Sequence, residues 1–140
     1  MSVSLRQQDL YTMIQDIWDR LTRLEKLVPI DNWTTIGEQG APAFENSWVN
    51  YGGTNASAAY YRDPFNVVRL KGLVKNGTIG GVPIFTLPVG YRPLEDVNMI
   101  AMSNGGVGYL FVQASSGEVR AIAGSNTYFS LDNVTFRAEQ

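Results

Sequence analysis

The stretch VSLRQQDLYTMIQDIWDRLTRLEKLV, residues 3–28, decides how this chain is built. Its apolar residues recur at alternating spacings of four and three, which is the 3.5-residue period of a coiled-coil helix. Gln7 is the one polar residue of this seam, and Pro29 ends the helix because its ring cannot continue the hydrogen-bond ladder. The remaining a and d positions of the heptads are Val3, Leu10, Ile14, Ile17, Leu21, Leu24 and Val28. The pattern predicts a helix that wraps around copies of itself.

The residue types in the seam favour three strands. Leu21 stands at an a position and Ile17 at a d position, a combination that disfavours dimers. The string from Arg20 to Glu25, RLTRLE, resembles the short trimerisation motif of parallel coiled coils, in which the Arg of one chain reaches the Glu of its neighbour. The residues predicted to hold the trimer together are Leu10, Ile14, Ile17, Arg20, Leu21, Leu24, Glu25 and Val28.

A second interpretation of the same helix stays open. Met13, Trp18 and Leu27 widen the apolar stripe, as in a single amphipathic helix that folds onto its own globular domain. The stripe alone does not distinguish that arrangement from a coiled coil.

After Pro29 the apolar period changes to two, which is typical of β-strands. Residues 66–75, NVVRLKGLVK, place Val68, Leu70, Gly72 and Val74 on one face, and residues 107–113 are apolar on both faces, as in a central strand or one that faces a partner subunit. Shorter runs at 84–87, 118–123, 128–131 and 134–138 are separated by turn dipeptides such as Asn76-Gly77 and Ser116-Gly117. We therefore expect a mainly β chain: an anchor and a parallel three-stranded coiled coil over residues 1–29, then an antiparallel β-sandwich head, jelly-roll-like, over residues 30–140. The three heads would share an interface around the trimer axis.

Composition excludes several classes of function. The net charge is −2, which gives no electrostatic basis for binding nucleic acid, and no apolar run is long enough to enter a membrane. Histidine and cysteine are absent, which removes imidazole bases, thiol nucleophiles and the usual zinc ligands. The head's carboxylates show no spacing that dictates a catalytic pair. We expect a non-enzyme without cofactor or metal, with a calcium site at surface carboxylates such as Asp63 or Asp96 as the open alternative.

Four segments together carry a resemblance to a known family. They are GAPAFENSWVN (40–50), VRLKGLVK (68–75), PIFTLPVGYRP (83–93) and YFSLDNVTF (128–136). The chain resembles the C-terminal head of tail-fibre, minor-tail and other virion structural proteins of tailed bacteriophages. The resemblance implies a trimeric, β-rich knob that is made in the host cytoplasm, displayed on the virion surface, and usually assigned to host adhesion. The prolines of the 83–93 segment bracket a short strand, so we interpret that segment as structural rather than as a binding site.

The candidate ligand-binding residues are Trp48, Asn50, Tyr51 and Tyr61. Flat aromatic faces beside amide groups are what a sugar-binding site needs, and the first three lie next to a glycine-rich loop. The competing interpretation is that Trp48 and some of the tyrosines fill the core. Trp33, directly after the predicted stalk, is interpreted as a packing residue.

The predicted function is a trimeric virion appendage, most simply a tail-fibre or tail-tip receptor-binding protein that recognises a host surface glycan without catalysis. Residues 1–10 would attach it to another virion protein. The alternative is a capsid-surface fibre or decoration protein with no specific ligand. The short segment before the stalk favours that alternative, because tail fibres often carry a larger attachment domain.

Overall fold

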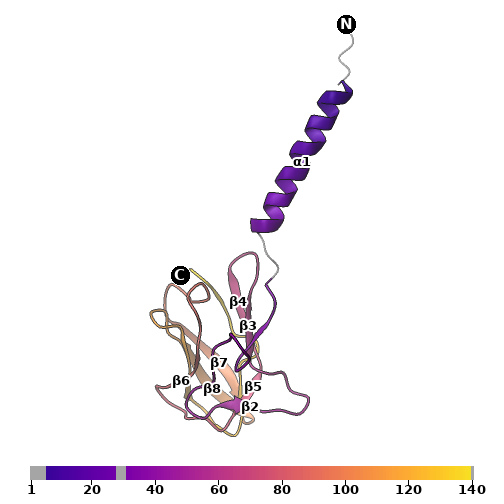
Figure 1. Ribbon diagram of the computed structural model, residues 1–140. Coiled ribbons are helices and arrows are strands. Elements are labelled where there is room, and N and C mark those ends of the chain that lie inside the picture. The colour runs from indigo at the N-terminus through magenta and orange to yellow at the C-terminus, as the bar shows by residue number, and fades with distance from the viewer. Residues whose placement is uncertain (1–5, 28–30, 140) are drawn as a thin grey trace. The chain divides into compact units, whose positions relative to one another are not determined.

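The computed structural model describes residues 6–27 and 31–139 of the chain, with the side chain of Leu27 excluded. The chain divides into two compact units, Met1–Ile30 and Asp31–Gln140 (Figure 1). The sequence-based boundary differs from this one by a single residue. Each unit is described by itself below.

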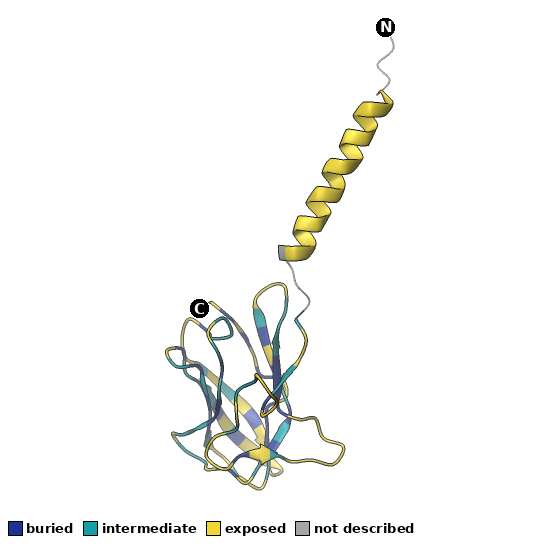
Figure 2. Cartoon of the chain, in the orientation of Figure 1, coloured by how far each residue is buried: buried dark blue, intermediate teal, exposed yellow. Residues whose placement is uncertain are grey.

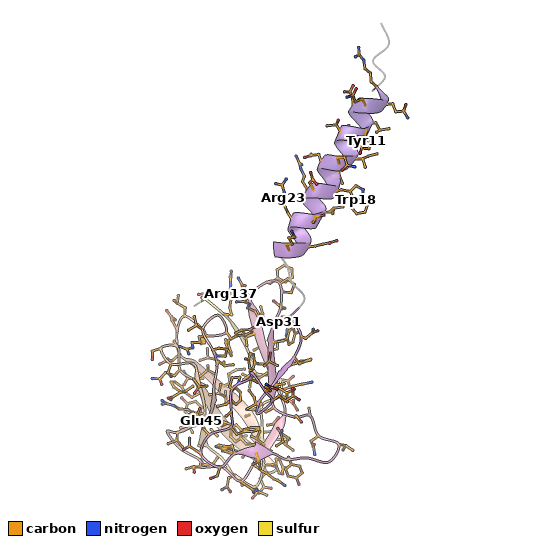
Figure 3. The ribbon with its side chains drawn as sticks, in the orientation of Figure 1. Tyr11, Trp18, Arg23, Asp31, Glu45 and Arg137 are labelled. Carbon is orange, nitrogen blue, oxygen red and sulfur yellow. The ribbon has the colours of Figure 1, made fainter. Side chains whose placement is uncertain are left out.

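The first unit is one helix, α1 (Gln7–Leu27). Asp9 in its first turn and Lys26 in its last complement the helix dipole, and Arg20 pairs with Asp16 one turn earlier at 3.1 Å. The described seam residues Leu10, Ile14, Ile17, Leu21 and Leu24 are 44–56% exposed in the single chain. Figure 2 shows the whole described helix as exposed, and in Figure 3 its labelled side chains, Tyr11, Trp18 and Arg23, project from it. The predicted helix is thus confirmed over its described length; Val3 and Val28 lie outside the described residues.

The second unit is built of two antiparallel sheets. One has four strands in the order β1-β3-β4-β11, and the other has seven in the order β2-β5-β10-β7-β8-β9-β6. The strands are β1 (Thr34–Thr35), β2 (Val49–Asn50), β3 (Ala59–Arg62), β4 (Val67–Lys71), β5 (Leu73–Lys75), β6 (Pro83–Thr86), β7 (Val97–Ser103), β8 (Gly106–Val112), β9 (Glu118–Ala123), β10 (Phe129–Ser130) and β11 (Thr135–Arg137). The predicted mainly β head with antiparallel sheets is confirmed, while its jelly-roll connectivity stays a prediction.

Both sheets contribute to one hydrophobic core. The four-stranded sheet supplies Val68, Leu70 and Phe136, and the seven-stranded sheet supplies residues such as Leu110 and Phe129. Inward and outward side chains alternate along β4, β5, β7, β9 and β11 and along most of β8, so that burial in these strands follows the period-two pattern of the sequence. The alternation leaves each sheet with a second, outer face that takes no part in the core.

Gly72 corrects the prediction of a single strand over residues 66–75. The stretch forms β4 in one sheet and β5 in the other, and Gly72 lies at the crossing with φ 120°. A Cβ there would lie 2.5 Å from the Cα of Ala58, so only glycine fits. The buried series Val68, Leu70 and Val74 is confirmed, because one core is filled from both sheets.

Candidate functional site

The outer face of the four-stranded sheet carries aromatic and cationic side chains. Tyr60 and Leu70 point into the core, which turns their neighbours Tyr61, Arg69 and Lys71 outward. The register places Tyr61 opposite Arg69 and Ala59 opposite Lys71. Side chains of β3 and β4 are thereby brought next to one another.

Trp33, which directly precedes β1, forms a cluster with Tyr61 and Lys71 that we call the Trp33 shelf. The rings of Trp33 and Tyr61 meet edge to face with centroids 4.5 Å apart, and Lys71 Nζ lies 4.4 Å from the centroid of the Trp33 ring. An exposed cation–π contact of this kind contributes about 0.5–1 kcal/mol. Ala59 on the same face is buried although it is outside the core cluster, because the shelf lies over this part of the sheet.

The shelf combines the groups that recognise sugars. Trp33 keeps 42% of its surface exposed, which leaves apolar ring area on which a ligand ring can stack. Lys71 adds three hydrogen-bond donors and a positive charge over one face of that ring. Arg69, whose guanidinium lies 3.6 Å from Asp63, adds a second cationic donor opposite Tyr61.

A second aromatic cluster, the Tyr51 pair, lies on the seven-stranded sheet. The rings of Tyr51 and Tyr128 meet edge to face with centroids 6.0 Å apart, and Lys75 Nζ lies 5.1 Å from the centroid of Tyr51. The N–H of Tyr51 donates to the carbonyl of Leu73 at 2.8 Å, which extends the pairing of β2 with β5 to this residue. The exposed glycine-rich loop at residues 52–55 follows directly.

The four residues predicted to bind a ligand do not form one site. Tyr61 belongs to the Trp33 shelf and Tyr51 to the Tyr51 pair, on different sheets. Asn50 has a structural role, because its side-chain oxygen accepts the N–H of Ala58 at 2.8 Å.

Trp48 is a core residue, and its assignment to a ligand-binding face is wrong. Its side chain is 1% exposed and packs edge to face on Phe129. Its ring also occupies the space beside Gly77, where an added Cβ would lie 1.9 Å from the indole. A tryptophan enclosed in this way has no free face on which a sugar could stack.

From the sequence, Trp33 was assigned to packing, and Lys71, Lys75 and Tyr128 were not among the predicted binding residues. The two lysines alternate with buried residues in the 66–75 stretch, which is a signal for an outward position. The sequence pattern could not identify the aromatic partner of either lysine, because each lysine contacts an aromatic residue more than 20 positions away in the chain. Such pairs depend on strand register.

The 83–93 segment has a structural role in the head. Tyr91 donates its hydroxyl to Asp31 Oδ2 at 3.1 Å, and the backbone N–H of Arg62 donates to the same oxygen at 2.9 Å. The Arg62 side chain in turn donates to the carbonyl of Gly90 at 2.7 Å, and Arg92 donates to that of Leu87. We call Asp31, Arg62 and Tyr91 the Asp31 clamp; it joins the first residue of the head to β3 and to this segment.

Burial raises the pKa of the Tyr91 hydroxyl, and the negative charge of Asp31 raises it further. Burial likewise raises the pKa of Tyr60, whose ring meets that of Tyr91 with centroids 4.9 Å apart. Both hydroxyls are therefore neutral at physiological pH and serve as hydrogen-bonding groups of the fold.

A shallow depression of about 320 Å³ lies between the 93–97 segment and β11. Its charged lining residues are Glu95, Arg137 and Glu139, of which the last two pair at 3.5 Å. Phe136 at its floor is 7% exposed, so it offers little surface for stacking. The depression is a weaker candidate for a sugar site than the Trp33 shelf.

The described residues contain neither a cluster of metal ligands nor a membrane-spanning helix. Over residues 6–27 and 31–139, no three or more acidic side chains gather in a way that could hold a metal ion. The helix in the described part of the chain is not long and apolar enough to span a bilayer.

Comparison with known proteins adds one likeness. The sequence matches no family model and no curated protein. Among solved structures, the chain is similar to the receptor binding protein (gp15) of Listeria phage PSA, with a TM-score of 0.73 and 13% sequence identity over 99% of this chain and 83% of that one. The two proteins share a fold. The likeness agrees with the family resemblance at the level of the fold and does not bear on the 83–93 segment.

Proposed function

We propose that the chain is a bacteriophage virion appendage whose β head binds a receptor on the host surface. The observation that carries this proposal is the fold shared with a phage receptor binding protein over 99% of the chain. Two exposed aromatic clusters with lysines, on a head without His or Cys, support a role in binding rather than catalysis. A tail location follows from the same likeness.

The appendage is a trimer held by α1. Most of the stability of a helix in a protein comes from the packing of its apolar face, and α1 carries an apolar seam that the helix by itself leaves about half exposed. Leu21 at a and Ile17 at d favour three strands over two. Coiling three copies in parallel buries the seam of each.

The residues that flank the seam support parallel chains in register. In a parallel coil each g position lies beside the e′ position five residues later in the neighbouring chain. This rule pairs Arg6 with Tyr11, Met13 with Trp18, and Arg20 with Glu25. The three pairs are a cation–π contact, a sulfur–aromatic contact and an ion pair, all favourable. In an antiparallel arrangement these g and e′ residues would no longer lie beside one another, and the three favourable pairs would not form.

The ligand class we propose is a host surface glycan, bound without chemical change. The Trp33 shelf is the principal site, and the Tyr51 pair is a second one. The carboxylates near them are engaged in the fold: Asp63 accepts from the N–H groups of Phe65 and Val67, and Asp31 belongs to the Asp31 clamp. Each head binds weakly, and three heads gain affinity through effective concentration. Residues 1–10 attach the trimer to the virion.

The direct test measures binding of the purified protein to a glycan array and to whole host cells. Trp33→Ala is expected to weaken binding by about 5- to 150-fold, since truncating an aromatic residue at the centre of a binding site costs about 1–3 kcal/mol. Phe65→Ala is the matched control, because Phe65 is also an aromatic residue at the surface, at 80% exposure, and lies outside both clusters. No binding by the unmodified trimer to either target would reject the receptor-binding proposal.

Immunogold labelling of virions separates tail from capsid. Label at the tail tip supports a receptor-binding protein. Label over the capsid, with hundreds of copies per particle, would favour the capsid fibre or decoration protein and would reject the tail assignment.

A further inference from the structure

The outer face of β7 and β8 is apolar and open in the single chain. Ile100 is 81% exposed, Val107 75%, Met102 55% and Tyr109 37%. Together with the half-buried Phe111 these residues form what we call the apolar face. The register pairs Ile100 with Tyr109 and Met102 with Val107, so they are contiguous across the two strands.

When one face of an antiparallel sheet is solvated, its strands normally alternate apolar residues that face the core with polar residues that face water. On β7 and β8 only Asn98 follows that rule at the outer face, and its side chain accepts the Tyr109 hydroxyl. The inner face of the same strands is filled by core residues such as Leu110 and Val112. Both faces of these strands are therefore suited to burial.

No formal charge lies on the apolar face. The nearest one is Arg120 of β9, which stacks on Phe111 with 5.8 Å between its guanidinium carbon and the ring centroid and is neutralised by Glu118. A face of this kind does not repel an identical face, and burying it leaves no charge without a partner. The outer face of the other sheet carries Lys71 and the ion-paired Arg69 and Arg137, so packing copies there would take charged side chains out of water at a desolvation cost.

We propose that the apolar face packs against other copies of this head in the trimer. This inference rests on the proposed three-stranded coil. Only three residues separate Leu27, the last residue of α1, from Asp31, the first residue of the head unit, so a coil holds its heads at about millimolar effective concentration or above. At that concentration an exposed apolar sheet face meets another head more often than any other partner.

The chain has no cysteine, so an introduced thiol is the only one and its reactivity reports burial directly. Val107→Cys places a thiol on the apolar face, and Thr135→Cys places one at an exposed outward position of β11 on the opposite sheet. The rate of maleimide labelling of the full chain is measured for each variant and divided by its rate in denaturant, which removes intrinsic differences in reactivity. Light scattering after gel filtration gives the oligomeric state. If Val107→Cys does not fold, Met102→Cys replaces it.

We expect both variants to be trimeric, with labelling of Val107→Cys at least 10-fold slower than that of Thr135→Cys. A trimer with equal rates overturns this inference and leaves the coiled-coil trimer intact. A monomer overturns both. Slow labelling in a monomer also overturns it, because another part of the same chain then covers the face.

Discussion

The two outer faces of the head differ although they flank the same core. The four-stranded sheet turns Tyr61, Arg69 and Lys71 outward, and the seven-stranded sheet turns Ile100 and Val107 outward. Strand alternation and the shared core are alike on both sides, so neither explains the difference. The inner faces specify the fold, and the outer faces indicate what each side of the head meets. One has the chemistry of a solvated binding surface and the other that of an interface between copies.

The largest effect on stability is expected in the core that the two sheets share. Trp48→Ala removes a fully buried indole beneath both sheets and should lower the free energy of unfolding by about 3–5 kcal/mol. Trp33→Ala, the same substitution on the outer face of the four-stranded sheet, should lower it by less than about 1 kcal/mol. Denaturant titrations of the two variants check this. Equal losses would mean that the Trp33 shelf is part of the core.

The second largest effect is expected from a charge on the apolar face, which should destabilise the trimer. Ile100→Glu buries an unpaired carboxylate if this face lies between heads, and should cost about 3 kcal/mol of trimer stability. Thr135→Glu on the opposite sheet should change it by no more than about 0.5 kcal/mol. Thermal unfolding at two protein concentrations measures both. A neutral Ile100→Glu would show that the apolar face is solvated.

The Asp31 clamp sharpens the comparison, because the strand to which it bonds, β3, belongs to the four-stranded sheet. Asp31→Ala leaves the Arg62 N–H and the Tyr91 hydroxyl without their acceptor and should lower stability by about 1–2 kcal/mol. Amide exchange should accelerate in β1 and β3 and change little in β8. Asp31→Asn keeps an acceptor oxygen and should cost less. Uniform acceleration across both sheets would contradict a local clamp.

The smallest effect is a pH dependence confined to alkaline solution. The pKa values of Tyr60 and Tyr91 are raised above 10.0 in the fold, so on raising the pH the unfolded chain loses these protons first. The folded state then binds more protons than the unfolded state, and stability falls as pH increases above about 10. Their contribution is fully present below that pH. Denaturant titrations between pH 8 and 11.5 measure the slope, and Tyr91→Phe should reduce it. An unchanged slope in that variant would exclude Tyr91 as a source.

Much of the fold was predictable from the sequence because burial follows simple periods. Glu118–Ala123 was predicted with the bounds of β9, and the predicted run at 134–138 contains β11 and places Val134, Phe136 and Ala138 in the core. By contrast, β7 was missed, because its outward residues Ile100 and Met102 are apolar and hide the alternation that marks a strand. The same residues that conceal the strand form the apolar face.

The candidate site was less predictable, because a single sequence does not tell a buried aromatic from an exposed one. Trp48 and Trp33 are both followed by strand-forming residues, and their predicted roles were the reverse of their exposures. Their environments depend on distant partners, Gly77 and Phe129 for one and Tyr61 and Lys71 for the other. The tertiary fold brings these partners together.

The Asp31 clamp also has a mechanical consequence. A particle tethered through the N-terminal helix pulls on the head at its first residue, and β1, which pairs with β3 through only two residues, would peel away easily under such a load. Asp31 precedes β1 in the chain and is bonded to Arg62 in β3 and to Tyr91. Tension therefore reaches a bonded side chain before it reaches the weak edge strand.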